Sequence, residues 1–331
     1  MSEPAEIGGP WAYSAYGYTL LSEVKLHCLR AAEPDAKPDL HVSASWSKEV
    51  SQIEIPDDAV MRTDAVTADG RPYLSVWAKQ EGIRISHHSD EGAVVFTLVG
   101  APPRILVEIA PNTPAVDVEA YLIGRVLGSM MRFLKLTCLH GAFLEVDGAA
   151  IGFLGGKGAG KSTILATSAI AGHAVIADDI GVLQASGAGS WSIPPAYPFL
   201  RAWPQSIAEL TISPRAVAGP VISFNQKRYV DLTVPPFSHV NRPMPLHALV
   251  VLGDRKGRTY DLQRLTGAAG LVPLSAHTYA PYVDAPASRH RDLLTLAQVV
   301  KQCQVFSLCL PNEVNALENQ IEKVLSEIVS T

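Results

Sequence analysis

The stretch from Gly155 to Ser162 has the residue types and spacing that point most directly to chemistry. It reads Gly-Gly-Lys-Gly-Ala-Gly-Lys-Ser, which is the spacing G-x-x-x-x-G-K-S. Glycines let the backbone turn tightly and direct several N–H groups into one hollow that suits phosphate oxygens. The lysine of such a loop reaches the terminal phosphates, and its serine hydroxyl can bind Mg²⁺. The stretch therefore predicts a phosphate-binding loop (P-loop) for a nucleoside triphosphate, ATP or GTP.

The segments on either side of this loop have the patterns that such a loop requires. An apolar run at residues 149–154 predicts a buried strand, and residues 163–170 read as a helix. The positive N-terminal end of that helix would favour a bound phosphate. A glycine-rich connector without a ligand is the alternative, but the complete motif with both flanks argues against it. The residues predicted to contact the nucleotide are Gly155, Gly156, Lys157, Gly158, Ala159, Gly160, Lys161, Ser162 and Thr163.

A pair of carboxylates follows the next predicted strand. The short apolar run at residues 174–177 ends in Asp178 and Asp179. Acidic residues at the end of a strand beside a phosphate loop commonly hold Mg²⁺ and orient the attacking group. An acidic surface turn is the alternative interpretation of the same pattern.

Composition limits the classes of partner. The chain has 331 residues, which is enough for two compact domains, and 47% of them are hydrophobic. Its formal net charge of −5 gives no overall attraction to nucleic acid or to an anionic membrane. The four cysteines are scattered without a C-x-x-C pair, so neither a zinc ribbon nor a disulfide framework is indicated. Because no signal-peptide pattern and no membrane-length apolar run is present, we expect a soluble cytoplasmic protein without a nucleic acid or membrane partner.

The patterns along the chain divide it into two predicted domains. Residues 1–113 consist mostly of short alternating runs separated by turn clusters, which predicts a β-rich domain for substrate recognition or assembly. Residues 114–331 would form the α/β domain with the phosphate loop, joined to the first by a helix at 114–135. We also expect an irregular loop at residues 194–204, which hold four prolines, and loop-rich structure at 267–270 and 277–290. A final amphipathic helix is predicted from Val314 onward.

The spacing of these motifs resembles that of the HPr kinase/phosphorylase catalytic domain. Leu139-His-Gly141 precedes the loop by about fifteen residues, and Gly172-His-x-x-x-Ala-Asp-Asp179 follows it. The pieces at 197–203, 227–229 and 277–279 resemble the branch of HPr-kinase-like proteins found with peptide-maturation genes. That branch includes kinases that phosphorylate the C-terminal serine of lasso-peptide precursors.

The resemblance implies a fold and an activity. The fold would be α/β, with a P-loop catalytic domain of the HPr-kinase-like and phosphoenolpyruvate-carboxykinase-like type, built on a mixed sheet and preceded by a smaller β-rich α+β domain. The activity would be Mg²⁺-assisted transfer of phosphate from ATP to a serine hydroxyl on a peptide or small protein. The acceptor would be a serine such as the C-terminal one of a lasso-peptide precursor. Such proteins are often homo-oligomers, and the sequence fixes no stoichiometry.

The resemblance also implies roles for individual residues. Lys161 and Ser162 would hold the triphosphate and Mg²⁺, Asp178 would help to hold the metal, and Asp179 would be the base near the attacking hydroxyl. The sequence does not fix how the two aspartates divide this work. His140 would lie beside them, with a packed structural imidazole as the alternative. Three cations could neutralise the moving phosphoryl group or form an exposed salt-bridging surface instead: Arg201, Lys227 and Arg228.

One departure from the family pattern bears on function. HPr kinases typically carry Glu-Ile-Arg-Gly-Leu-Gly after the acidic pair, whereas this chain has Phe199-Leu-Arg-Ala-Trp-Pro204. Arg201 is kept, but the glutamate, a metal ligand in that family, is absent. This argues against phosphorylase activity and against HPr as the acceptor. It also leaves open a nucleotide-binding regulatory protein without transfer activity and, less favoured, a kinase for a small molecule.

Overall fold

The computed structural model describes residues 4–79, 82–187, 189–255, 259–283, 287–311 and 317–331. The described residues fall into two compact units. Unit 1 lies within Met1–Lys135, Pro220–Asn225 and Tyr282–Asp284, and unit 2 within Leu136–Gly219, Gln226–Pro281 and Ala285–Thr331. The helix at 114–135, which the sequence suggested as part of the second domain, is therefore grouped with unit 1.

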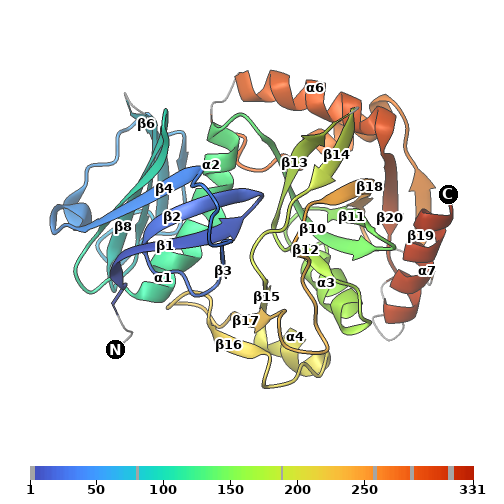
Figure 1. Ribbon diagram of the computed structural model, residues 1–331, viewed down its shortest axis with the longest axis horizontal. Helices are drawn as coiled ribbons and strands as arrows, with labels where there is room; N and C mark the ends of the chain where they lie inside the picture. The colour runs from blue at the N-terminus through green and yellow to red at the C-terminus, as the bar shows by residue number, and fades with distance from the viewer. Residues whose placement is uncertain (1–3, 80–81, 188, 256–258, 284–286, 312–316) are drawn as a thin grey trace. The chain divides into compact units, whose positions relative to one another are not determined.

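Unit 1 is built around a mixed sheet of nine strands among its described residues, in the order β3-β1-β2-β4-β9-β8-β7-β6-β5 (Figure 1). Pairings β2–β4 and β4–β9 are parallel and the others antiparallel. In β9 the buried Ile105 and Val107 alternate with exposed Arg104 and Leu106, so one face of the sheet packs inward. The strands are β1 (Ile7–Ala15), β2 (Tyr18–Val24), β3 (Arg30–Ala31), β4 (Leu40–Trp46), β5 (Met61–Arg62), β6 (Leu74–Lys79), β7 (Gly82–His88), β8 (Ala93–Gly100) and β9 (Pro103–Ile109), with the 3-10 helix η1 (Glu49–Gln52) between β4 and β5.

The helix after β9 in unit 1 has three consecutive segments. They are α1 (Ala115–Tyr121), the π-helical turn η2 (Leu122–Val126) and α2 (Leu127–Phe133). Val118, Val126 and Met130 are fully buried, as the apolar spacing predicts.

Unit 2 holds the glycine-rich loop and a second mixed sheet. Strands β11, β18 and β20 run parallel to one another, whereas β10, β13, β14 and β19 join by antiparallel pairing. The pairings β11–β10–β13–β14–β18–β11 close into a ring. Large mixed sheets with helices agree with the predicted α/β class. The strands are β10 (Thr137–Val146), β11 (Ala149–Leu154), β12 (Val175–Ala177), β13 (Ile180–Ser186), β14 (Ser190–Ile193), β18 (Met244–Leu252), β19 (Asp261–Arg264) and β20 (Gln304–Cys309).

Helices cover this sheet, and a small second sheet adjoins it (Figure 1). The buried core joins α3 and α7 to side chains of β10, β11, β18 and β20. The helices are α3 (Lys161–Ile170), α4 (Pro204–Glu209), α5 (Ala268–Ser275), α6 (Ala287–Gln302) and α7 (Leu317–Ser330); the three-stranded sheet contains β15 (Phe199–Ala202), β17 (Arg228–Asp231) and β16 (Val217–Pro220), in that order. In α7, Ile321, Val324 and Ile328 are buried, which confirms the apolar face predicted there. Val314, the predicted first residue of that face, lies outside the described residues. No helix in the described ranges is long and apolar enough to cross a membrane.

Two glycines beside Phe143, Gly152 of β11 and Gly181 of β13, allow these strands to approach β10 closely. Phe143 is fully buried. A Cβ on Gly152 would lie 2.5 Å from Phe143 Cε1, and a Cβ on Gly181 would collide with the same ring. Because only glycine leaves room there, the aromatic ring can pack against β11 at Gly152 and against β13 at Gly181.

Two loop predictions are wrong, and a third extends too far. Residues 194–204 contain β15, and Pro204 opens α4, where proline is accepted because its missing N–H has no helical partner. Residues 268–270 begin α5, and Gly267 is its N-cap with φ 53°. The glycines there mark a helix start and a close contact, since a Cβ on Gly270 would lie 3.3 Å from Val300. The loop predicted at 277–290 ends earlier, because α6 begins at Ala287; residues 284–286 lie outside the described ranges.

Candidate phosphate-binding and acidic site

The glycine-rich loop connects the buried strand β11 to helix α3, as the sequence predicts. Gly158 and Gly160 have φ values of 84° and 98°, in the left-handed region that side chains disfavour. Gly155 is required for a different reason, because a Cβ there would lie 2.9 Å from the Cβ of Ala159. The motif's glycines therefore fit the conformation of this turn.

The loop presents amide groups and an ammonium group at the start of α3. The first helical hydrogen bond is donated by Ile164 N–H to Gly160 O over 2.9 Å, so the preceding amides are not used within the helix. Lys161 Nζ donates hydrogen bonds to Gly155 O at 2.7 Å and Gly156 O at 3.0 Å. The lysine side chain is thus folded back along the loop. This arrangement suits an anion at the helix N-terminus.

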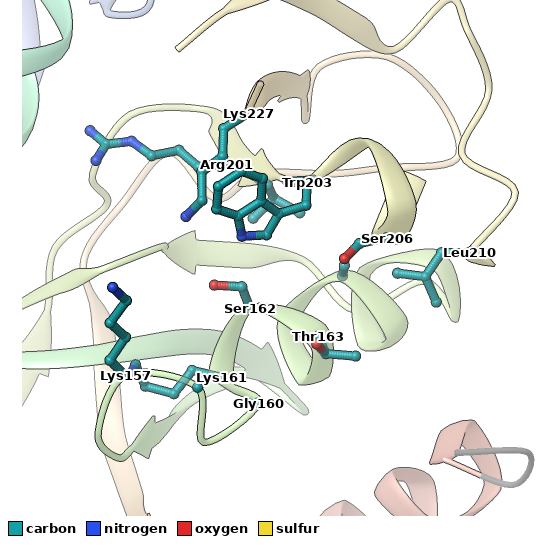
Figure 2. Close-up of a pocket in the computed structure, with 14 residues that line it drawn as sticks. Lys157, Gly160, Lys161, Ser162, Thr163, Arg201, Trp203, Ser206, Leu210 and Lys227 are labelled. Atoms are coloured by element: carbon teal, nitrogen blue, oxygen red, sulfur yellow. The ribbon is translucent and has the colours of Figure 1, made fainter. Parts of the chain in front are cut away.

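A cavity of about 310 Å³ opens beside this loop (Figure 2). One wall consists of the loop and the first turns of α3, including Ser162 and Thr163. The opposite wall consists of β15 and α4, including Trp203 and Ser206, with Lys227 from the segment before β17. Figure 2 shows the Ser162 hydroxyl and the Trp203 ring on opposite walls.

The acidic pair lies at a break between two strands that both pair with β10. Ala177 of β12 lies opposite Phe143, and Ile180 of β13 lies opposite His140. Asp178 and Asp179 fill the break, and Asp179 has φ 81°. A left-handed conformation is uncommon for a residue with a side chain, and such strain concentrates at functional sites.

His140 orients Asp179. Its Nδ1 lies 3.1 Å from Asp179 Oδ1 and 3.0 Å from Asp179 O. The backbone N–H of His140 donates a hydrogen bond to His277 O over 2.8 Å, which holds this part of β10 in place. On the second carboxylate oxygen, Arg201 Nη1 lies 3.8 Å from Asp179 Oδ2. Asp179 is therefore held between an imidazole and a guanidinium.

Asp178 is buried beside these groups. Its Oδ2 accepts a hydrogen bond from the backbone N–H of Arg201 at 3.1 Å. Burial raises the pKa of Asp178, the negative charge of Asp179 raises it further, and Arg201 and Lys227 oppose the change. The pKa of Asp178 therefore depends on the charges that surround it.

Arg201 is a cation whose guanidinium group has N–H donors that are not used in hydrogen bonds within the described residues. Its guanidinium carbon lies 5.5 Å from the centroid of the Tyr197 ring, and its side chain is 19% exposed. Burial acts against the charged form, but Tyr197, Tyr229 and the two aspartates outweigh it and raise the pKa of Arg201. Among the described residues, its Nε and Nη2 atoms have no hydrogen-bond partner. A buried guanidinium in this state is suited to an anionic ligand.

The loop and the acidic pair interact electrostatically. Burial lowers the pKa of Lys161, and the charges of Asp179 and Asp178 oppose that shift. Burial likewise lowers the pKa of His277, followed by the charges of Lys161 and His140. The structure thus brings together Lys161, His140 and both aspartates, which lie up to 39 positions apart in the sequence.

Two residues near the site were not singled out as site residues from the sequence. His277 follows helix α5, and its backbone carbonyl accepts a hydrogen bond from the His140 N–H; its only sequence signal is the His-x-Tyr piece of the family resemblance. Arg255 follows β18, and its Nη2 would lie 3.3 Å from a Cβ placed on Gly160. No local pattern around Arg255 indicates this position, because it results from the parallel pairing of β11 and β18.

The three candidate cations have different positions. Arg201 and Lys227 line the cavity, and Lys227 Nζ lies 5.2 Å from the Trp203 ring centroid. Arg228 is exposed and is not among the residues that line the cavity. Arg228 is the first residue of β17, whereas Lys227 belongs to the segment before that strand. The predicted contact between Arg228 and the phosphoryl group gains no support from this placement.

Comparisons with known proteins give a partial match. No family model matches the chain. Over 126 residues it is 30% identical to the HPr kinase/phosphorylase of Aromatoleum aromaticum, a match that covers 34% of this chain and 39% of that protein. This chain is similar to HPr kinase/phosphorylase. The solved HPr(Ser) kinase/phosphatase from Coxiella burnetii matches 57% of this chain and 94% of its own, with 14% identity and a TM-score of 0.32.

The departure from the HPr kinase pattern has a structural counterpart. Phe199 occupies the place where the resemblance predicts a glutamate, and its ring packs edge-on against Tyr229 with centroids 5.6 Å apart. An aromatic contact thus stands where a metal-binding carboxylate is expected.

Proposed function

We propose that this protein is a kinase that transfers the terminal phosphoryl group of ATP to a serine hydroxyl on a peptide or small protein. One observation carries the proposal: the lysine of a phosphate-binding loop lies within electrostatic reach of two carboxylates, of which Asp179 is held by His140 and Arg201. The sequence similarity to an HPr kinase/phosphorylase supports the same class of reaction.

The proposed step is an in-line displacement. The acceptor oxygen forms a bond to the terminal phosphorus, and the bond from that phosphorus to its bridging oxygen breaks, so that the electron pair leaves with ADP. The hydroxyl proton passes to the carboxylate of Asp179. His140 would keep Asp179 oriented through the contact at Oδ1, whereas Lys161 and Arg201 would stabilise the negative charge on the transferred group.

The residues present fit a Mg²⁺ ion bound together with the nucleotide. Ser162 would contribute a hydroxyl oxygen and Asp178 a carboxylate, which are the hard oxygen donors that Mg²⁺ prefers. In the described part of the chain, no group of three or more His, Cys, Asp or Glu side chains is arranged to hold a metal. This fits an ion held chiefly by substrate phosphates and water, with one or two protein ligands. When bound, Mg²⁺ would neutralise charge on the phosphates.

The proposed acceptor is a peptide with an accessible serine, such as the C-terminal serine of a lasso-peptide precursor. The packing of Phe199 on Tyr229, in place of a glutamate, argues for an acceptor other than HPr. A nucleotide-binding protein without transfer activity is the second candidate, and the same absent carboxylate favours it.

Intact-mass spectrometry tests the proposal. The purified protein is incubated with Mg²⁺, ATP and peptides that end in serine, with HPr and matched peptides ending in alanine as comparators. We expect a gain of one phosphate group on the serine peptides. This gain should be lost in Lys161→Ala and in Asp179→Asn, although Asp179→Asn should still bind ATP.

The possible results separate the two candidates. Binding of ATP without transfer to any serine peptide or to HPr would favour the regulatory protein. Full transfer by Asp179→Asn would exclude Asp179 as the base. If the wild-type protein binds no nucleoside triphosphate, both candidates are wrong.

A further inference from the structure

The wall of the cavity that faces the phosphate loop carries an exposed tryptophan. Trp203 is 50% exposed, although it lies between a strand and a helix of the fold. It is the N-cap residue of α4, and Ile207 N–H donates a hydrogen bond to its carbonyl over 3.0 Å. The preceding residue, Ala202, is paired with Arg228 across β15 and β17. The backbone that carries the indole ring is therefore fixed at both ends, and the ring is available to a ligand.

The surroundings of Trp203 suit a flat, aromatic group with polar edges. The apolar side chains of Leu200, Ala202 and Leu210 line the same cavity, and the Ser206 hydroxyl adds a polar group. The ammonium group of Lys227 lies over the indole, 5.2 Å from the ring centroid, which holds the ring by a cation–π contact. The volume of about 310 Å³ lies within the range of small-molecule sites, about 300–1,000 Å³.

The position of the cavity indicates which part of a substrate it would take. In the proposed reaction the acceptor hydroxyl must reach Asp179, on the side of the terminal phosphate where His140 also lies. Within the described part of the chain, neither Asp179 nor His140 lines the cavity. The cavity instead continues from Ser162 along α3 past Thr163 and Ala166. Arg201, which contacts Asp179, lines the cavity as well. The cavity therefore extends from the neighbourhood of the acidic site along α3, where the remainder of the nucleotide would lie in the proposed binding mode.

We propose that this cavity binds the nucleoside part of the triphosphate, with the base stacked on Trp203. The proposal rests on the proposed function, because it requires a triphosphate on the loop. A nucleobase has an apolar face and polar edges, which matches the walls of the cavity. Stacking does not depend on which base is present, since every base has a π face. Trp203 therefore supports ATP and GTP alike, and any preference between them comes from groups at the edge of the base.

Calorimetric titration with ATP, GTP and inorganic tripolyphosphate tests the proposal. The proteins compared are the wild type, Trp203→Ala, Trp203→Phe and the control Trp46→Ala. Trp46 is a good control because it is 47% exposed and belongs to β4 of unit 1. Thermal unfolding of each variant shows that it is folded.

The expected result is a loss of binding affinity that affects ligands with a nucleoside and not tripolyphosphate. Trp203→Ala should bind ATP and GTP about tenfold to a hundredfold more weakly, the range expected for one base–aromatic stack. Its affinity for tripolyphosphate should be unchanged. Trp203→Phe should retain most of the affinity for ATP, because it keeps an aromatic face, and Trp46→Ala should match the wild type.

Other results would overturn the inference and distinguish it from failure of the proposed function. If the wild type binds ATP and Trp203→Ala binds it equally well, the base lies elsewhere and the proposed function is unaffected. A variant that binds ATP normally but needs more serine peptide would assign Trp203 to the acceptor instead. An equal loss for ATP and tripolyphosphate would show that the ring affects the phosphate loop and not the nucleoside. If the wild type binds neither ligand, the proposed function fails as well.

Discussion

Asp117 of unit 1 and Asp178 of unit 2 are both buried, and they differ in what surrounds them. In unit 1, Asp117 is fully buried in α1, and both its oxygens accept hydrogen bonds from Ser223. The Ser223 N–H donates to Oδ1 and the hydroxyl to Oδ2, each over 2.7 Å. In unit 2, Asp178 is 5% exposed and accepts a hydrogen bond from the Arg201 N–H. Its further electrostatic neighbours are charged side chains: Asp179, Arg201 and Lys227.

This difference separates a structural carboxylate from a candidate functional one. Asp117 joins two segments that lie 106 positions apart, so its hydrogen bonds hold unit 1 together. In the proposed function, the charges around Asp178 would change on binding of the nucleotide phosphates and Mg²⁺. Burial raises the pKa of both aspartates, so a raised pKa alone does not identify a functional site. The charged groups that surround the carboxylate distinguish the candidate functional site from the structural one.

The largest expected effect is on phosphoryl transfer. Asp178→Asn removes a charge beside the glycine-rich loop, and we expect it to lower the rate of the proposed transfer about a hundredfold or more, as for loss of a preorganised electrostatic contact. Asp117→Asn should leave the rate unchanged, since Asp117 belongs to the hydrogen-bonded pair of unit 1. Initial rates of ADP formation with a serine peptide measure both. Equal rates for the two variants would contradict the assignment of Asp178 to the functional site and of Asp117 to a structural role.

A smaller effect is expected on stability. Ser223→Ala removes the hydroxyl donor and leaves Asp117 Oδ2 buried without that hydrogen bond. We expect the free energy of unfolding to fall by about 1–3 kcal/mol, measured by urea denaturation. Ser326→Ala, on an exposed position of α7, is the matched control and should lie within about 0.5 kcal/mol of the wild type. If Ser223→Ala behaves like the control, the Asp117 pair is not structural.

The smallest effect is a pH dependence of stability. Burial raises the pKa of Asp117 above its ordinary value of 3.8; the hydrogen bonds from Ser223 oppose the shift, and the charge of Glu91 adds to it. Between 3.8 and the raised value the folded protein binds more protons than the unfolded chain. This contribution to stability is therefore fully present below pH 3.8 and is lost as the pH rises through the folded pKa.

Comparison with Asp117→Asn isolates that contribution. The difference in unfolding free energy, wild type minus variant, should fall as the pH rises from the acidic range towards neutral. The fall should be about 1.4 kcal/mol for each unit by which the pKa is raised. Urea denaturation at a series of pH values measures it. A difference that rises with pH would mean that the folded protein lowers the pKa of Asp117.

Much of the candidate site was predictable because its parts are local in the sequence. The glycine-rich loop is one continuous stretch, and its strand and helix follow from the apolar runs beside it. The turn at Asp147–Gly148 joins β10 to β11, and the apolar face of α7 follows from its spacing. These features depend on backbone preferences and on hydrophobic periodicity, which a sequence displays directly.

The failures arise where tertiary contacts override a local signal. The prolines of 194–204 indicate a loop, but Phe199–Ala202 pairs with Arg228–Asp231 and becomes a strand. The glycines at 267–270 indicate a turn, but they allow α5 to start and to pack closely on α6. Neither partner is visible from the local pattern.

The sequence by itself determined that a glycine-rich loop with the spacing G-x-x-x-x-G-K-S and an acidic pair are present, because each is specified by neighbouring residues. Only the tertiary structure decided what lies around them. Strand register brought His140 to Asp179 and set Asp179 in its left-handed conformation. Sheet pairing placed Trp203 and Lys227 on one cavity wall and left Arg228 outside. These contacts join residues far apart along the chain, and their geometry depends on how strands pair, which no local pattern records.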